Sequence, residues 1–353
     1  MTRAETRRIY VGGVPIGGGA PVTVQSMCNT KTEDVPATLA QIERLREAGC
    51  DIVRLAVPNM EAARSLGEIK EKAGLPIVAD IHFDYRLAIE AAAAGADKIR
   101  INPGNIGSPE KVRAVADACR ARNIPIRVGV NSGSLEKDLL LKYGAPTAKA
   151  MVESARRHIE LLNSFDFDDI CLSLKASSVP LTVEANLLAA REFPYPLHLG
   201  ITEAGTAYSG LVQSAVGLGA LLCQGIGDTI RVSLTADPVE EVRAGIAILK
   251  AAGLRKGGVR LISCPSCGRC GIDLIRTAEE VEAMLAGCPR DITVAVMGCV
   301  VNGPGEAREA DYGLAGGQGV GVLFKKGRVV GKIPSEKLAQ ALVELIKQDD
   351  AKS

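Results

Sequence analysis

The chain has 353 residues, which is enough for two domains or for one large barrel with an appended unit. Its 42 basic and 41 acidic residues leave a formal net charge of +1, so no overall field attracts nucleic acid or a membrane, and any anion site must be a local cluster. An apolar content of 47% excludes a mainly disordered chain, and five Phe, six Tyr and no Trp argue against base-stacking platforms for nucleic acid.

Residues 8–20 are expected to form a small hairpin turned at Gly12-Gly13 and at residues 17–19. After this hairpin one short sequence pattern recurs: a helical segment ends in Gly, a charged residue or Pro follows, and a run of β-branched residues begins. An example is Gly95-Ala96-Asp97 before Lys-Ile-Arg-Ile. Such runs are typical of buried parallel strands. Strands are expected near residues 22–26, 52–56, 77–81, 98–102, 126–130, 169–174, 197–201 and 229–234.

A helix-length segment follows each of these strands. The first helix, after Asp34 and Pro36, and the last, after Asp237 and Pro238, each have a capping carboxylate and a proline in the first turn. This repetition predicts an α/β fold, a parallel (β/α)8 TIM-type barrel that includes the hairpin and covers residues 1–253. A doubly wound open sheet remains the alternative, because the sequence alone does not show that the sheet closes.

After Gly253 the regular alternation of strand and helix segments ends. A strand is expected at 259–263, a helix near 277–287, a strand at 292–297, a Gly-punctuated hairpin at 313–332 and a closing helix at 335–348. This order predicts that residues 254–353 form a small α+β domain.

In a parallel barrel the active site lies at the carboxyl ends of the strands. Cationic side chains are expected at these ends, namely Arg54, Arg100, Arg127, Lys175 and Arg231. Such a cluster repels itself unless an anion is present, and the guanidinium fork matches phosphate oxygens. We therefore expect a substrate with more than one phosphate, unless some of these side chains point into the barrel layers or pair with Asp80 and Glu203.

Three groups at the strand ends are suited to proton transfer: Asp80, His82 and Glu203. Lys175 offers a different chemistry, because a desolvated lysine there would form a Schiff base, as in sugar-phosphate aldolases. Of the remaining histidines, His158 is expected on the surface, and His198, at the start of a strand, is expected to be structural.

The opening segment has no apolar core and no run of 18 apolar residues occurs, so we expect a cytoplasmic protein whose cysteines are reduced. In the second domain Cys264, Cys267 and Cys270 follow one strand, and Cys299 follows another. This spacing predicts a metal site in which these four thiolates hold zinc or an iron–sulfur cluster. The other cysteines are expected to be mostly buried and structural: Cys28, Cys50, Cys119, Cys171, Cys223 and Cys288.

A series of motifs runs through the chain: Val-Gln-Ser-Met, Asp-Ile-His-Phe, Lys-Ile-Arg-Ile-Asn-Pro-Gly-Asn, Arg-Val-Gly-Val-Asn, Gly-Ile-Thr-Glu-Ala-Gly, Cys-Pro-Ser-Cys-Gly-Arg and Met-Gly-Cys-Val-Val-Asn-Gly-Pro-Gly-Glu. In this order, over nearly the whole length, they closely resemble the bacterial 4-hydroxy-3-methylbut-2-enyl diphosphate synthase family, in its compact form without an extra central domain. The resemblance implies that 2-C-methyl-D-erythritol 2,4-cyclodiphosphate is opened and reductively dehydrated in the methylerythritol phosphate route to isoprenoids.

The resemblance also implies roles for single residues. One 4Fe-4S cluster per chain would be held by Cys264, Cys267, Cys299 and Glu306, which leaves Cys270 outside the ligand set, unlike the four-cysteine expectation. A carboxylate is a hard, exchangeable ligand that can release its iron to substrate. The implied substrate-binding residues are Arg54, Arg100, Arg127, Asn131, Lys175, Arg231 and Ser233. The implied catalytic residues are Asp80, His82 and Glu203, with Glu203 protonating the departing hydroxyl.

The chain has no dinucleotide-binding fingerprint. We therefore expect the two electrons of the reaction to arrive one at a time, from reduced flavodoxin or ferredoxin through the cluster. The last barrel helix, 238–252, is expected to end opposite the mouth, and the linker 253–258 spans at most about 20 Å. We therefore expect a homodimer in which each cluster domain covers the partner's barrel, with neither nucleic acid nor membrane as partner. Two rival functions remain: a Schiff-base aldolase acting on a sugar phosphate through Lys175, and a non-catalytic metal-binding or electron-carrying module.

Overall fold

The computed structural model describes residues 1–299 and 308–350 and divides the chain into two compact units, Met1–Arg255 and Lys256–Ser353. We refer to them as the barrel unit and the second unit. None of the described helices is long and apolar enough to cross a membrane.

The barrel unit is built on one sheet of parallel strands with the order β8-β7-β6-β5-β4-β3-β10-β9. A parallel bridge between Leu172 in β8 and Leu197 beside β9 joins the two ends of this order, so the sheet closes on itself. The expected TIM-type barrel is confirmed, and the alternative of a doubly wound open sheet is excluded. The strands are β3 (Thr23–Met27), β4 (Ile52–Ala56), β5 (Ile77–Asp80), β6 (Lys98–Ile101), β7 (Ile126–Asn131), β8 (Ile170–Lys175), β9 (His198–Leu199) and β10 (Thr229–Ile230).

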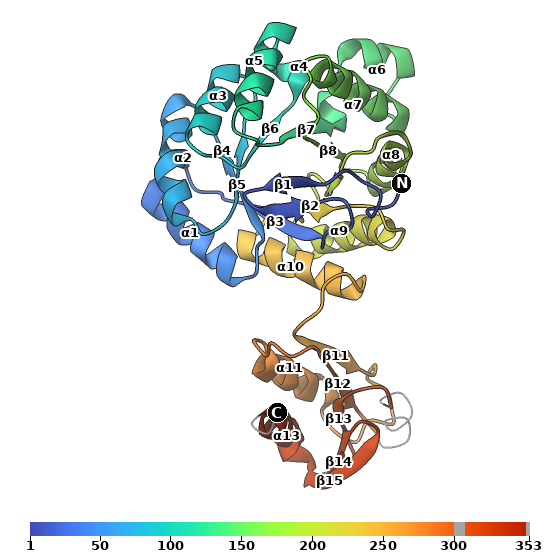
Figure 1. Ribbon diagram of the computed structural model, residues 1–353. Helices are drawn as coiled ribbons and strands as arrows, with labels where there is room; N and C mark the ends of the chain where they lie inside the picture. Colours follow the sequence, from blue (N-terminus) through green and yellow to red (C-terminus); the bar gives the residue numbers. More distant parts are fainter. Residues whose placement is uncertain (300–307, 351–353) are drawn as a thin grey trace. The chain divides into compact units, whose positions relative to one another are not determined.

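Helices surround this ring of strands (Figure 1). The caps are those expected: the Asp34 carboxylate accepts from the Ala37 N–H at the start of α1, and Asp237 accepts from the Val239 N–H at the start of α10. The helices are α1 (Val35–Glu47), α2 (Met60–Lys72), α3 (Tyr85–Ala93), α4 (Pro103–Ile106), α5 (Pro109–Arg120), α6 (Lys137–Tyr143), α7 (Ala148–Asn163), α8 (Val179–Glu192), α9 (Ala207–Leu222) and α10 (Pro238–Ala251), with a 3-10 turn, η1, at Ser132–Ser134.

Alternation along the strands separates an apolar outer layer from a polar interior. In β6, Ile99 and Ile101 belong to the large core between strands and helices, whereas Lys98 and Arg100 lie outside that core. Successive strand residues point to opposite faces, so the two cations face the inside of the barrel. Barrel interiors are usually filled with Val, Ile and Leu, and the polar interior here therefore indicates a function.

The N-terminal hairpin closes the amino end of the barrel. It pairs β1 (Ile9–Val11) with β2 (Val14–Ile16), and Figure 1 shows the two strands across the middle of the ring. Its side chains form a buried cluster with Ile52, Val78 and Cys171, which lie at the amino ends of their strands. At the turn, a Cβ on Gly12 would lie 2.6 Å from the Asp97 carboxylate, so only glycine fits this approach.

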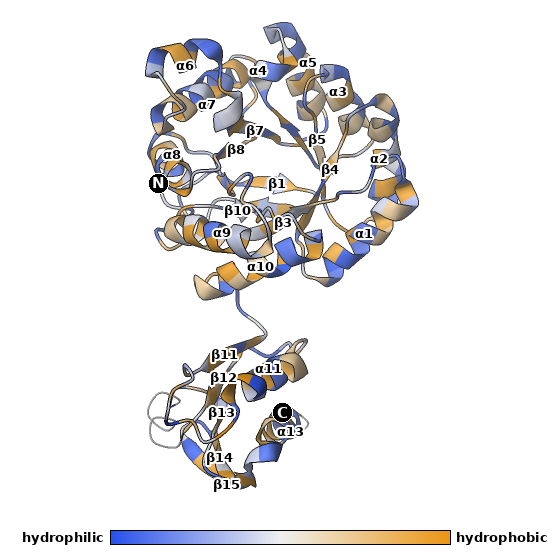
Figure 2. Cartoon of the chain, turned by 180° about the vertical axis from the view of Figure 1, so that it is seen from behind, coloured by the Kyte–Doolittle hydropathy of each residue, from blue (hydrophilic) through white to orange (hydrophobic). Residues whose placement is uncertain are grey.

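The second unit has a five-stranded mixed sheet of order β11-β12-β13-β14-β15. β11, β12 and β13 are parallel, and β13, β14 and β15 are antiparallel, so the hairpin expected at 313–332 is in fact part of a three-stranded meander. Figure 2 shows α11 and α13 on one side of this sheet, where their leucines share a core with β12 and β13. The elements are β11 (Val259–Ser263), α11 (Leu274–Leu285), β12 (Ile292–Met297), β13 (Tyr312–Ala315), β14 (Val320–Lys325), β15 (Arg328–Pro334), the 3-10 turn η2 (Ser335–Lys337) and α13 (Leu338–Asp350).

Two local expectations are wrong. His158 is buried and not on the surface, because the segment before α6 packs over α7 and brings the Glu136 carboxylate within 3.1 Å of His158 Nε2. Cys223, at the end of α9, is exposed, whereas Cys28, Cys50 and the other barrel cysteines are buried as expected.

The hairpin cluster makes the stability of the barrel depend on a segment outside the β-α repeat. Replacing the fully buried Ile16 with Ala should destabilise the barrel unit by about 2–5 kcal/mol, because it leaves a cavity at the closed end. Tyr10→Ala, at an exposed position of the same hairpin, should change stability by less than about 0.5 kcal/mol. Urea unfolding followed by circular dichroism measures both variants, and equal midpoints for the two would contradict the closing role of the hairpin.

Candidate active site

A cavity lies at the carboxyl ends of the barrel strands, where the sequence predicts the active site. The structure brings together there all the side chains assigned to substrate binding, although they come from five different strands or strand ends. Gly129, Ser173 and Thr202 complete the lining. The full set is Arg54, Arg100, Arg127, Gly129, Asn131, Ser173, Lys175, Thr202, Arg231 and Ser233.

Asp80 lies beneath this cavity as the counterion of two arginines. Its Oδ2 is 3.1 Å from Arg54 Nη2 and its Oδ1 is 3.3 Å from Arg100 Nη1, and the carboxylate is fully buried. Burial alone would raise the pKa of Asp80, but the neighbouring arginines outweigh it and the pKa is lowered. Asp80 is therefore a carboxylate at neutral pH, and it orients the two guanidinium groups.

Glu241 is a second buried counterion, which the sequence analysis missed. Its carboxylate lies 3.4 Å from Arg231 Nη2 and accepts hydrogen bonds from the Ser26 hydroxyl and the Leu234 N–H. An acid in the first turn of a helix is commonplace, because it offsets the helix dipole, so the sequence gives no sign of this role. Together with Asp80 it fixes the geometry of the arginines.

Positive charge in this region exceeds negative charge. Burial and the neighbouring Arg127 and Arg231 hold the pKa of Lys175 well below its ordinary value, and burial lowers the pKa of Arg54 to about 10. Burial is the main cause of both shifts, repulsion from neighbouring cations adds to it, and the described lining of the cavity offers no carboxylate to offset it. A multiply charged anion supplies what is missing, and the donors around the cavity suit phosphate oxygens.

Two glycines make room for the cations. A Cβ on Gly129 would lie 2.9 Å from Arg100 Nε, and one on Gly200 would lie 2.6 Å from Lys175 Nζ. Gly129 is in β7, which pairs with the strand β6 that carries Arg100. Gly200 directly follows β9, which lies beside the strand β8 that carries Lys175. The cavity therefore depends on these small residues as well as on its charges.

Glu203 and His82 lie higher, at the rim. Glu203 is exposed and has a backbone φ of +54°, a left-handed conformation that is strained for a residue with a side chain. The His82 side chain is 55% exposed, and its Nε2 lies 3.9 Å from the Asp80 carboxylate. Both side chains are open to solvent, whereas Asp80 is enclosed.

In the second unit, two cysteine-bearing loops leave the same edge of the sheet. They follow the parallel neighbours β11 and β12 and are joined by a hydrogen bond from the Gly271 N–H to the Gly298 carbonyl. The Gly298 N–H donates to Cys264 Sγ at 3.2 Å, and a Cβ on Gly298 would lie 2.5 Å from Cys270 Sγ. Cys264, Cys270 and the Gly298–Cys299 turn are thus in one place.

These thiols have the chemistry of cluster ligands. Hydrogen bonds from the backbone and side chain of Arg269 lower the pKa of the exposed Cys267, and the Gly298 N–H donates to Cys264 Sγ, as backbone amides do to the sulfurs of iron–sulfur clusters. Within residues 1–299 and 308–350, no three His, Cys, Asp or Glu side chains are grouped closely enough to hold a metal ion. Glu306, the fourth ligand implied by the motif resemblance, lies outside the described residues.

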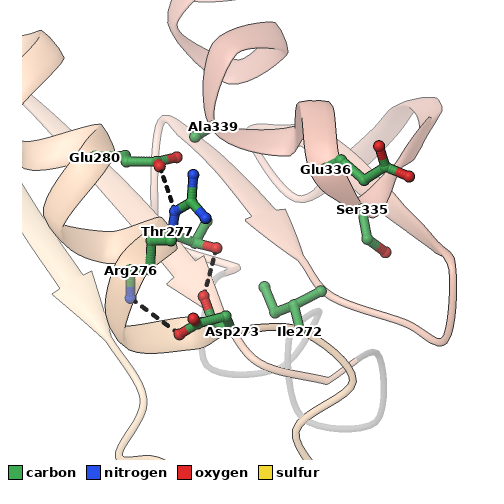
Figure 3. Close-up of a pocket in the computed structure, with 8 residues that line it drawn as sticks. All are labelled: Ile272, Asp273, Arg276, Thr277, Glu280, Ser335, Glu336 and Ala339. Atoms are coloured by element: carbon green, nitrogen blue, oxygen red, sulfur yellow. Dashed lines mark hydrogen bonds and ion pairs between the residues drawn. The ribbon is translucent and has the colours of Figure 1, made fainter.

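A second cavity lies in the second unit, between the start of α11 and η2 (Figure 3). Its polar groups satisfy one another: Asp273 accepts from the Arg276 backbone N–H at 3.2 Å, and Arg276 Nε donates to Glu280 at 2.8 Å. Ser335 donates to the Gly317 carbonyl. The described lining has three carboxylates, Asp273, Glu280 and Glu336, and one arginine. It therefore lacks the excess of positive charge found at the barrel mouth, which is the candidate active site.

The fold and the two sites define a class of protein, a TIM barrel with an anion-binding mouth joined to a small α+β unit that presents thiolates. Residues 6–246 match the GcpE TIM-barrel domain, and residues 260–348 match the GcpE protein C-terminal domain. The chain belongs to the GcpE family, as its motifs led us to expect.

Curated relatives match this chain over almost its whole length. A protein of Geobacter sulfurreducens is 61% identical over 341 residues, covering 97% of both chains, and one of Clostridium perfringens is 57% identical over 346 residues, covering 98% of this chain and 99% of the relative. Both are named 4-hydroxy-3-methylbut-2-en-1-yl diphosphate synthase (flavodoxin). Membership of this family implies an enzyme with an iron–sulfur cofactor, so the aldolase and the non-catalytic module lose their support.

Solved structures with little sequence identity share the barrel. Dihydropteroate synthase of Yersinia pestis matches with a TM-score of 0.51 at 14% identity, covering 70% of this chain and 97% of that one. A 3-dehydroquinate dehydratase of Geobacillus kaustophilus matches with a TM-score of 0.50 at 15% identity, covering 71% and 99%. These similarities concern the fold alone.

The close approach of Gly129 to Arg100 makes a specific prediction. Gly129→Ala should displace the guanidinium from Asp80 and weaken binding of inorganic diphosphate about tenfold, which corresponds to about 1.4 kcal/mol. Gly219→Ala, in α9, adds a methyl group to open space and should leave binding unchanged. Isothermal titration calorimetry measures both variants, and unchanged affinity for Gly129→Ala would refute the role assigned to this glycine.

Proposed function

We propose that this chain catalyses the reductive ring opening and dehydration of 2-C-methyl-D-erythritol 2,4-cyclodiphosphate to 4-hydroxy-3-methylbut-2-enyl diphosphate, in the methylerythritol phosphate route to isoprenoids. Two electrons enter, the C–O bond that closes the ring to phosphate breaks, and one hydroxyl leaves as water. The observation that carries the proposal is the excess of buried cations around the barrel mouth, in a chain 61% identical to a relative of that name.

The diphosphate is held by the cations of the mouth. Its negative charge relieves their repulsion, and Asp80 keeps Arg54 and Arg100 in place before the substrate arrives. Lys175 becomes fully charged against the phosphate, and Asn131 and Ser233 donate hydrogen bonds from the same lining. Binding of this kind fixes the carbon chain of the substrate above the arginine layer.

Proton delivery to the departing hydroxyl falls to Glu203. It is exposed at the rim, on a strained backbone that holds its position, and His82 offers a second donor there. Asp80 has a different role from the proton transfer expected of it, because its buried ion pairs keep it ionised. It acts on the reaction by positioning the arginines.

The redox part belongs to the second unit. We assign one 4Fe-4S cluster per chain to Cys264, Cys267, Cys299 and Glu306; when bound, it supplies single electrons from reduced flavodoxin, the donor in the relatives' names, or from ferredoxin. Cys270 stays outside the ligand set that the family motif implies, and its sulfur lies against Gly298 and the apolar core of the unit. The cytoplasm, where thiols remain reduced, suits this chemistry.

The homodimer expected from the sequence remains part of the proposal. Arg255, the last residue of the barrel unit, donates to Asp51 at 2.8 Å and to the Gly49 carbonyl, both just before β4 and therefore at the amino end of the barrel. Only residues 256–258 separate this anchor from β11, a span of about 10 Å. This supports an assembly in which each second unit serves the barrel mouth of the partner.

Anaerobic preparation of the protein tests the function and its cofactor together. Wild type should contain about four irons per chain, absorb in the visible range and turn over the cyclodiphosphate with a reductant. Cys299→Ser should lose both iron and turnover, whereas Cys270→Ser should keep both, because its sulfur is not a ligand. A colourless zinc protein, or an active Cys299→Ser variant, would be incompatible with the proposal.

Mixing two inactive variants tests the shared site. Glu203→Gln should lower turnover by about 100-fold or more through loss of the general acid, and Cys299→Ser should abolish it. Random exchange of subunits should then restore about a quarter of wild-type activity, because half of the sites in each mixed dimer are intact. No recovery between folded, exchanging variants would exclude a site shared between chains.

A further inference from the structure

Below the mouth cavity, the barrel interior contains a layer of buried polar side chains that the reaction does not use. Lys98 pairs in register with Val78, and Arg100 pairs with Asp80, so Lys98 lies one level nearer the closed end than the arginine layer. It is completely buried, and its Nζ has no hydrogen-bond partner among the residues described. One side-chain nitrogen in each of Gln25, Arg127 and His198 is likewise buried without a hydrogen-bond partner among the residues described.

No carboxylate is available to Lys98. Asp80 is committed to Arg54 and Arg100, and Asp97, at the start of the same strand, pairs with Lys70 at 2.6 Å and accepts from the Ile77 N–H. Asp228 accepts from Thr6 and the Leu197 N–H. The hairpin below contributes only apolar groups, Ile9, Val11 and Ile16. The charged or titratable groups that interact with Lys98 from the other strands are Arg54 of β4, Arg127 of β7, Cys171 of β8 and His198 of β9. Lys175 of β8 interacts in turn with Cys171 and His198, and Arg231, paired with Glu241 beyond the end of β10, interacts with Lys175 and Arg54.

Repulsion among these buried cations is relieved most easily at a lysine. A guanidinium keeps its proton in a protein interior, whereas a buried ammonium gives its proton up readily. Burial, with further contributions from Arg127 and Arg54, lowers the pKa of Lys98 to about 8. Arg127 also lines the mouth cavity, so it lies between Lys98 and any anion bound there.

We propose that Lys98 is a positioning residue that works as a proton acceptor for the anion site: in alkaline solution it is uncharged in the free protein and becomes protonated when a diphosphate binds in the mouth above it. The inference rests on the proposed function only in taking the ligand to be a diphosphate. The proton comes from solvent, and no covalent bond is made or broken. Lys98 does not touch the diphosphate and acts on it through Arg127 and the field inside the barrel, where charges interact strongly.

The sign of the pH dependence follows directly. Binding raises the pKa of Lys98 from about 8, so the protein takes up protons on binding most strongly above about pH 8. Affinity then falls as pH rises through that range, by about tenfold per pH unit for each proton taken up. Lys175, in the cavity itself, also has a lowered pKa and takes up a proton on binding, so the two lysines must be separated by mutation.

The test uses the holoenzyme and methyl diphosphate, a probe whose last pKa near 6 leaves it fully ionised at about pH 8.5. Calorimetric titration in two buffers of different ionisation enthalpy counts the protons taken up. Lys98→Met should reduce the uptake by up to one proton and flatten the fall of affinity with pH accordingly. Lys72→Met, which removes an exposed lysine paired with Glu68, is the matched control and should behave as wild type.

Lys98→Arg provides the second variant, because its charge is permanent. It should also lose the uptake, yet bind the probe at about pH 9 at least as tightly as wild type, whereas Lys98→Met should not; a merely structural lysine would not separate the two in this way. Equal proton uptake in wild type and either folded variant would overturn the inference and leave the diphosphate site intact. Failure of wild type to bind the probe would overturn both.

Discussion

Repulsion between cations confined inside the barrel is the constraint on which the rest of the structure depends. Arg54, Arg100, Arg127, Lys175 and Lys98 lie in a region of low dielectric constant, where unpaired charges are costly. The fold offsets this cost with two buried carboxylates, with glycines that leave room for long side chains, and with a large apolar core outside the strands. The barrel is thus stable in spite of the charges in its interior, and the remaining excess of positive charge is what we propose binds a diphosphate.

The two units divide the work of a 4-hydroxy-3-methylbut-2-en-1-yl diphosphate synthase between a binding function and a redox function. Each unit has its own apolar core, so changes in one need not disturb the packing of the other. The barrel supplies charges at the carboxyl ends of its strands, where the buried carboxylates of Asp80 and Glu241 hold the arginines. The second unit presents its thiols on loops, where backbone amides can approach sulfur.

Most of the fold was predictable from sequence because each helix-to-strand joint is marked locally. Gly49, Gly95 and Gly225 have the left-handed backbone expected of residues that end a helix. The extents of β9 and β10 were not predictable, and both are shorter than their apolar runs. Hydrogen bonds to neighbours distant in sequence decide where a strand stops, and no local pattern records them.

The candidate site was predictable to the same degree. Cations at strand ends could be recognised as soon as a barrel was assumed, but the depth of Lys98 follows only from closure of the sheet, although it lies two residues from Arg100. His158 looked like a surface residue because its partner, Glu136, is on a different element. Spacing alone likewise treats Cys270 as equal to Cys264 and Cys267, and only the order of the family motifs leaves it outside the implied ligand set.

The anchor of Arg255 on Asp51 has a mechanical consequence. The same Asp51 carboxylate accepts the Val24 N–H at 2.7 Å, so the end of the barrel unit is tied to both β3 and β4, and β4 carries Arg54. Beyond Arg255 the chain is tied at once to the second unit, since the Gly257 N–H donates to Asp291 and the Gly258 N–H donates to the Pro289 carbonyl. Lys256 alone separates these anchors, so a pull on the second unit is transmitted first to the two strands at the start of the barrel.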